Sequence, residues 1–135
     1  MIERLALLFL VVILAAASYK MLRRWQVAQA VRRVTANDPL VSRLRPGVPA
    51  ILYFSSPTCA PCHTQQRPAL QRLLAELGDR VQVIEVNALE QRDVAARWGV
   101  WSVPTTVVLD WQGRPRAVNT GVTAPDTLRR QLQGL

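Results

Sequence analysis

Two cysteines, Cys59 and Cys62, are the only cysteines in the chain of 135 residues. They follow an apolar stretch of β-forming residues and precede a segment with helical spacing. Cysteines three positions apart at a helix start can close a disulfide within one turn. There, the unpaired amides and the positive end of the helix dipole favour thiolate over thiol, and thiolate is the nucleophile. The pattern predicts redox chemistry in which Cys59 attacks a disulfide and Cys62 resolves the mixed disulfide.

Two other uses of cysteine match the same residues less well. With His63 the motif reads Cys-x-x-Cys-His, the pattern of c-type haem attachment, but Met1 and Met21 are the only methionines available as a second axial ligand. Zinc requires three or four ligands, and Cys59, Cys62 and His63 are too close in sequence to surround one ion. No metal site is therefore predicted. Two buried, unreactive cysteines remain the structural alternative.

The segment that surrounds the cysteines alternates short apolar stretches with helical ones. We predict a strand over 50–54, a helix over 62–77, a strand over 81–86, a helix over 89–98, strands over 105–109 and near 116–120, and a helix that opens at 124–126. The order is β-α-β-α-β-β-α. A helical crossover implies parallel neighbours, and the tight turn at Gln112-Gly113 implies an antiparallel pair. We therefore expect an α/β fold with a central mixed sheet.

These features together resemble the thioredoxin family. The resemblance rests on Cys59-Ala60-Pro61-Cys62 after a buried strand, on Trp98-Gly99-Val100-Trp101-Ser102-Val103-Pro104-Thr105, and on Gly113 and Gly121. It implies a thioredoxin fold over 46–135. It also implies that Pro104 is cis and lies against the disulfide, that Val103 offers its backbone to an extended substrate segment, and that Thr105, Ala60 and Pro61 support the motif. Trp101 either forms an apolar platform beside the cysteines or belongs to the core.

The resemblance further implies a protein disulfide reductase whose redox-active disulfide serves without any cofactor. Its substrates would be protein disulfides, and its electrons would come from an upstream donor such as a thioredoxin reductase or a membrane reductase. A non-catalytic, thioredoxin-like binding module is the alternative.

The chain departs from the family pattern near the cysteines. Tyr53 stands where the family often has a buried acid, and Val83 stands where the lysine that pairs with that acid commonly falls. The usual base for deprotonating the second cysteine is thus lost, and Glu85 is the nearest candidate in sequence. Thr58 replaces a tryptophan, and Pro68 comes one residue later than the family's helix proline.

The N-terminal part of the chain is apolar and then basic. Residues 5–19 carry no charge, whereas residues 20–45 hold seven of the 17 basic residues against one acid. We predict a transmembrane or signal-anchor segment over 1–22 and a basic juxtamembrane helix and linker over 23–45, broken at Asn37-Asp38-Pro39. The net charge of +8 borders the apolar segment, so membrane lipid is the expected partner rather than nucleic acid.

The flanking charges predict which side of the membrane holds the domain. Basic residues after the apolar segment resist translocation, which favours a single-pass anchor with the domain on the cytoplasmic face. Two alternatives stay open. Ala15-Ala16-Ala17 resembles the cleavage site of a signal peptide. An extracytoplasmic domain would suit a thiol reductase of the cytochrome c maturation type.

Overall fold

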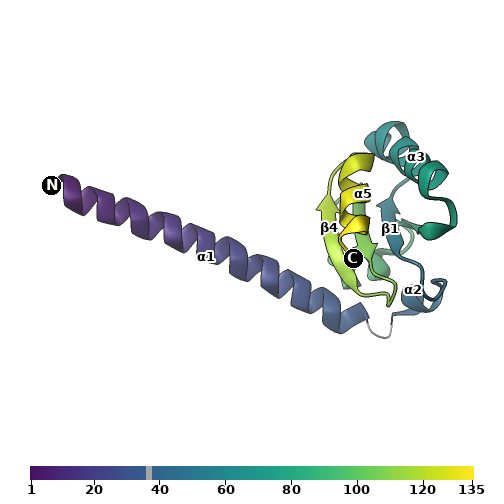
Figure 1. The fold of residues 1–135 in the computed structure, drawn as a ribbon, viewed down its shortest axis with the longest axis horizontal. Coiled ribbons are helices and arrows are strands. Elements are labelled where there is room, and N and C mark those ends of the chain that lie inside the picture. Colours follow the sequence, from purple (N-terminus) through teal and green to yellow (C-terminus); the bar gives the residue numbers. More distant parts are fainter. Residues whose placement is uncertain (36–37) are drawn as a thin grey trace. The chain divides into compact units, whose positions relative to one another are not determined.

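The computed structural model of the chain describes residues 1–35 and 38–135 (Figure 1). It divides into two compact units, Met1–Ala30 and Val31–Leu135. The predicted break at Asn37 lies outside the described residues.

Helix α1 spans Ile2–Thr35. Its segment Ile2–Leu22 has a mean hydropathy of 2.3, and none of its most apolar window is buried. At roughly 1.5 Å per residue these 21 residues exceed 30 Å, which is enough to cross the hydrocarbon layer of a membrane. A signal sequence near an N-terminus has the same length and composition.

A four-stranded mixed sheet forms the centre of the second unit. The strands are β1 (Ala50–Ser55), β2 (Gln82–Asn87), β3 (Thr105–Leu109) and β4 (Pro115–Thr120), in the spatial order β2-β1-β3-β4. Strand β1 pairs with β2 in parallel and with β3 antiparallel, and β3 pairs antiparallel with β4. The predicted α/β fold with a mixed sheet is confirmed.

Helices cover both faces of the sheet (Figure 1). Because successive strand residues point to opposite faces, β1 divides its side chains between two apolar clusters. Ile51 and Tyr53 pack with residues of α3 (Arg67–Leu77) and α5 (Pro125–Gln133). Leu52 and Phe54 pack with residues of α4 (Arg92–Arg97) and with Trp98. Every residue of β1 is buried, as its continuous apolar sequence predicts.

A short helix, α2 (Pro39–Ser42), joins this second cluster from the N-terminal side. Leu40 is only 4% exposed, and Val41 and Leu44 pack beside it. The buried Asp38 caps α2 by accepting a hydrogen bond from the Leu40 amide, and it pairs with Arg97 of α4 at 3.1 Å. The apolar core of the domain therefore extends back to residue 40.

This packing leads to a prediction about where the stable domain begins. A chain that lacks residues 1–35 keeps α2, whereas one that lacks residues 1–45 loses the buried Leu40 and also Asp38, one of the two ion-pair partners of Arg97. We expect the shorter chain to be less stable by about 3 kcal/mol, since removal of a buried leucine costs about 2–5 kcal/mol. Urea unfolding of the two chains measures the difference, and equal midpoints and slopes would show that α2 adds nothing.

Candidate functional site

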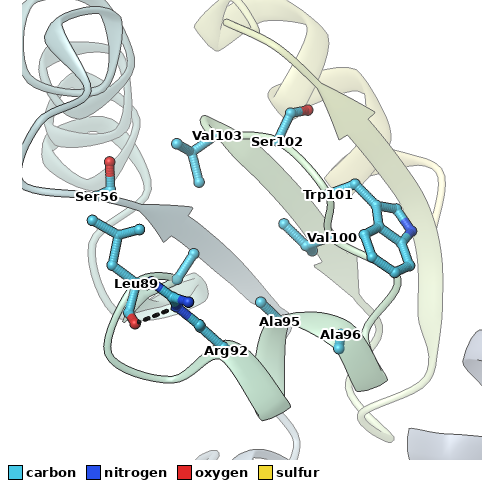
Figure 2. Close-up of a pocket in the computed structure, with 10 residues that line it drawn as sticks. Ser56, Leu89, Arg92, Ala95, Ala96, Val100, Trp101, Ser102 and Val103 are labelled. Atoms are coloured by element: carbon cyan, nitrogen blue, oxygen red, sulfur yellow. Dashed lines mark hydrogen bonds between the residues drawn. The ribbon is translucent and has the colours of Figure 1, made fainter.

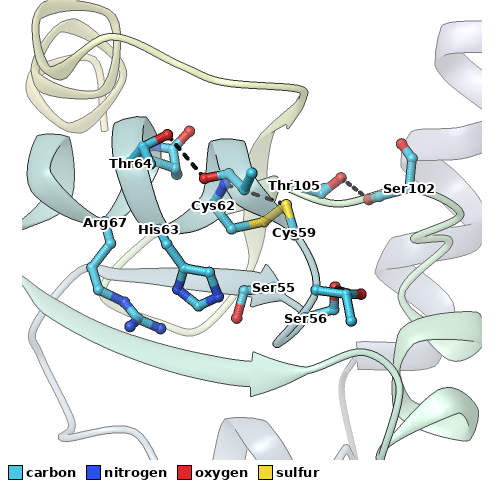
Figure 3. Close-up of a disulfide and its surroundings, with 12 residues drawn as sticks. Ser55, Ser56, Cys59, Cys62, His63, Thr64, Arg67, Ser102 and Thr105 are labelled. Carbon is cyan, nitrogen blue, oxygen red and sulfur yellow. Dashed lines mark hydrogen bonds between the residues drawn. A yellow bond between two sulfur atoms is a disulfide. The ribbon is translucent and has the colours of Figure 1, made fainter.

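The two cysteines lie just beyond the end of β1, where the chain turns into a helix (Figure 3). They form a disulfide with an S–S distance of 2.11 Å and a Cα–Cα distance of 5.3 Å. Cys62 is fully buried, at 0% exposure, whereas Cys59 is partly exposed. Of the two cysteines, Cys59 is therefore the one that a substrate can reach.

The start of the helix acts directly on the Cys59 sulfur. The backbone amide of Cys62 donates a hydrogen bond to Cys59 Sγ, with 3.2 Å between nitrogen and sulfur. Amides at the first turn of a helix have no partner within the helix, so a negative charge placed there is stabilised. After reduction, the same amide would favour the Cys59 thiolate.

A tyrosine occupies the space beneath the second cysteine. The Tyr53 hydroxyl donates a hydrogen bond of 2.8 Å to the carbonyl oxygen of Cys62, and the side chain is only 2% exposed. Burial, and then the nearby Glu85 carboxylate, raise the pKa of Tyr53 above its ordinary value. Tyr53 thus remains a protonated donor at neutral pH and offers no base to Cys62.

Glu85 lies opposite Tyr53 in the parallel pairing of β1 and β2, so both side chains project from the same face of the sheet. Its carboxylate accepts a hydrogen bond of 2.7 Å from the Ser55 hydroxyl and forms an ion pair with Arg67. Burial raises the pKa of Glu85, but the hydrogen bonds from Ser55 and Arg67 outweigh it and leave the pKa below its ordinary value. Glu85 is therefore held as a weakly basic, ionised carboxylate.

The helix after the cysteines begins with an unusual turn. Residues Cys62–Gln66 are π-helical, and the amide of Arg67 bonds to the carbonyl of Cys62, five residues earlier. A π-turn accommodates one more residue than an α-helical turn does. Because Pro68 stands one residue later than the family pattern places its proline, this turn absorbs the extra residue. The sequence predicted one regular α-helix over 62–77, whereas in the structure its first turn is π-helical and the α-helix begins at Arg67.

The loop before β3 carries the other predicted residues. The Val103–Pro104 peptide bond is cis. The carbonyl of the buried Pro104 accepts a hydrogen bond of 2.8 Å from the Gly121 amide, and the hydroxyl of Thr105 donates one of 2.7 Å to the carbonyl of Ser102. Figure 3 shows Ser102 and Thr105 beside the disulfide.

The other predicted site residues differ in how far they are buried. Val103 packs against the same apolar cluster as Cys59. Trp101 does not belong to the core, because it is 88% exposed. Ala60 and Pro61, between the cysteines, are exposed as well.

One residue that sequence reasoning missed links the two halves of the site. The Gln66 side chain is completely buried and bonds to both the amide and the carbonyl of Thr123, at 2.7 and 3.2 Å. Thr123 lies two residues after Gly121, whose amide donates the hydrogen bond to the Pro104 carbonyl. Gln66 therefore ties the cysteine helix to the segment that supports the cis-proline. A glutamine among apolar residues at helical spacing is the one sequence signal of this contact.

The described residues include no group of three or more His, Cys, Asp or Glu side chains that could hold a metal ion. The ring of His63, the ligand in the haem interpretation, is exposed and places Nε2 3.1 Å from the carbonyl oxygen of Pro57.

Known proteins share both this sequence pattern and this fold. A family model described as a thioredoxin-like domain matches residues 41–135. The thioredoxin of Bacillus subtilis (strain 168) is 36% identical over 56 residues, which cover 42% of this chain and 53% of that protein. Thioredoxin 1 of Synechococcus elongatus is 30% identical over 82 residues, which cover 61% of this chain and 73% of that protein. The first of these matches thus spans about half of the relative's length.

Solved structures agree on the architecture. The oxidised form of mitochondrial thioredoxin 3 from Saccharomyces cerevisiae superposes with a TM-score of 0.60 at 23% identity, covering 71% of this chain and 84% of that one. Thioredoxin-2, a component of the malaria parasite protein secretion machinery, gives 0.61 at 20% identity, covering 65% and 84%. At these identities the superpositions show a shared fold.

Proposed function

The chain belongs to the thioredoxin-like family of thiol–disulfide oxidoreductases, and we propose that it reduces disulfides of protein substrates at a membrane surface. The hydrogen bond from the Cys62 amide to Cys59 Sγ carries the proposal, because it favours a thiolate at the one cysteine of the pair that a substrate can reach.

The reaction takes two steps. The Cys59 thiolate attacks one sulfur of the substrate disulfide, so that a mixed disulfide forms and the other substrate sulfur leaves as a thiolate. Cys62 then loses its proton and attacks Cys59 Sγ. The Cys59–Cys62 disulfide forms, the second substrate thiolate leaves, and two electrons have passed to the substrate. An upstream reductase must return two electrons to the pair before the next cycle.

The cis-proline loop is the proposed place for the substrate chain. Val103 precedes Pro104 and packs on the cluster that Cys59 contacts, which supports pairing of its backbone with an extended substrate segment. The exposed indole of Trp101, three residues before Pro104, would add apolar contact to that segment.

Reduction of insulin disulfides tests this function against a non-catalytic binding role. The purified full-length protein with dithiothreitol should precipitate the insulin B chain much faster than dithiothreitol alone. The double variant Cys59→Ser/Cys62→Ser is the matched control. A rate equal to that of the control would contradict the proposed activity and favour a binding module.

The membrane part of the proposal rests on α1. We infer that residues 1–22 form an anchor, that the basic residues after it form a juxtamembrane segment, and that the domain, whose core reaches back to Leu40 and not only to the predicted residue 46, faces the cytoplasm. Support comes from the apolar, exposed segment Ile2–Leu22 and the basic residues that follow it.

Thiol labelling gives the sidedness, since the chain has no cysteines besides the redox pair. After treatment with a membrane-impermeant reductant, an impermeant maleimide should label the protein in broken cells but not in intact cells. The double serine variant should stay unlabelled in both. Labelling in intact cells would reverse the orientation and support the extracytoplasmic reductase.

A further inference from the structure

A groove of about 290 Å³ opens on the domain between α4 and the loop that leads to the cis-proline (Figure 2). Its walls come from the end of β1, the segment before α4, α4 itself and the loop that leads to the cis-proline. The lining is mostly apolar and includes Leu89, Ala96, Val100 and Trp101. Small-molecule sites usually measure about 300–1,000 Å³, so this groove suits one large side chain.

Two residues link the groove to the attacking cysteine. Ser56 and Val103 both line the groove. The carbonyl of Ser56 accepts a hydrogen bond of 3.2 Å from the Cys59 amide, and Val103 packs on the same cluster as Cys59. A substrate segment bound along Val103 would therefore pass directly from the disulfide to the groove.

One charged side chain stands among the lining residues. Arg92 is exposed, and its Nε donates a hydrogen bond of 3.3 Å to the carbonyl of Leu89, which holds the guanidinium near the groove. A cation beside a mostly apolar lining complements a carboxylate near an apolar side chain.

From these contacts we propose that the groove selects protein substrates in which a large apolar residue lies two positions from the cysteine that Cys59 attacks and an acidic residue lies two positions beyond it. In an extended segment, residues two positions apart project to the same side, about 6.6 Å apart. When the substrate cysteine faces Cys59, the large apolar residue two positions away can enter the groove and cover Trp101. The inference rests on the proposed function and adds its substrate class.

Peptides with one chromogenic mixed disulfide test the apolar part. Each peptide carries its cysteine joined to thionitrobenzoate, with Leu or Ser two positions before or after it. The reduced full-length protein in detergent releases thionitrobenzoate when Cys59 attacks the peptide sulfur. We expect one of the two Leu peptides to react about tenfold faster than its Ser counterpart, because it buries most of a leucine side chain. Equal rates for Leu and Ser in both arrangements would overturn the proposal.

Variants connect the preference to the groove. Leu89→Ser should lower the Leu-to-Ser ratio to about twofold, since it removes apolar lining from a side chain that is 48% exposed and does not support the core. Val118→Ser, at a β4 residue that is 44% exposed and outside the groove, is the matched control and should leave the ratio unchanged. A ratio that survives Leu89→Ser would place the preference elsewhere.

A charge reversal tests the acidic residue. Peptides with Asp two positions beyond the apolar residue should react faster than those with Lys there, and Arg92→Glu should reverse that order. Arg72→Glu, on the exposed side of α3, makes the same change of charge outside the groove and should not. An order that Arg92→Glu leaves intact would refute the charge component. If no peptide is reduced at all, the proposed function itself fails, whereas equal reduction of all peptides overturns only the substrate preference.

Discussion

Cys62→Ser should turn the protein into a trap that accumulates mixed disulfides with its substrates through Cys59. Cys59 keeps the features that make it reactive: the residue is partly exposed, and the amide of residue 62 still points at its sulfur. The second step is lost, because serine cannot attack the mixed disulfide. Turnover should fall about a hundredfold or more, since an intramolecular attack is replaced by that of thiols from solution.

Cys59→Ser should give the opposite result. The remaining thiol, Cys62, is fully buried and cannot reach a protein disulfide, so few adducts should form. Non-reducing gels and mass spectrometry of both variants, with the double serine variant as background, measure the difference. Equal trapping by the two single variants would contradict the assignment of roles.

The order of elements was accessible from the sequence because strands and helices differ in the period of their apolar residues. Strand β3, Thr105–Leu109, has the predicted limits, since Pro104 precedes it and the turn at Asp110 follows. The predicted helix over 89–98 is shortened to Arg92–Arg97. There the side chain of Asn87 accepts hydrogen bonds from the amides of Leu89 and Glu90 and stabilises a turn in place of the first helical residues.

The cysteines could be predicted from their spacing, and the cis-proline from the resemblance to the thioredoxin family. The contacts around them could not be predicted. The pairs Tyr53–Cys62, Ser55–Glu85 and Gln66–Thr123 join residues that are 9, 30 and 57 positions apart, so only the folded chain brings them together. The loss of the buried acid could be seen in the sequence, whereas the hydrogen bond that replaces it could not.

That hydrogen bond leads to a second prediction, on how fast Cys62 resolves a mixed disulfide. Tyr53 is a donor whose pKa is raised by burial, so it cannot take the proton from the Cys62 thiol. Cys62 lies in an apolar, fully buried site, which disfavours thiolate. Resolution should therefore be slow near neutral pH and accelerate by up to about tenfold per pH unit in the alkaline direction, as the reactive thiolate fraction increases.

Thionitrobenzoate release isolates this step. Ellman's reagent converts reduced Cys59 to a mixed disulfide and frees one thionitrobenzoate, and attack by Cys62 on Cys59 Sγ then frees the second. The rate of the second phase is followed by stopped flow from about pH 5 to pH 9. Tyr53→Asp should accelerate it near neutral pH, because a carboxylate there can accept the Cys62 proton. Tyr53→Asn is the matched control: asparagine has nearly the shape of aspartate but no acid, so it should not accelerate the second phase.

The two substitutions at Tyr53 should also differ in how much they destabilise the domain. Both substitutions remove the phenol ring and its hydrogen bond to the Cys62 carbonyl, and should destabilise the domain by about 3 kcal/mol or more. Asp should cost more than Asn, because its charge would lie near the Glu85 carboxylate, which already pairs with Arg67, and Val83 offers no positive charge. A second phase in the natural protein that is fast and independent of pH would instead show that a base already serves Cys62. Glu85→Gln would then be the decisive variant, since Glu85 lies opposite Tyr53 on the face of the sheet that packs against Cys62.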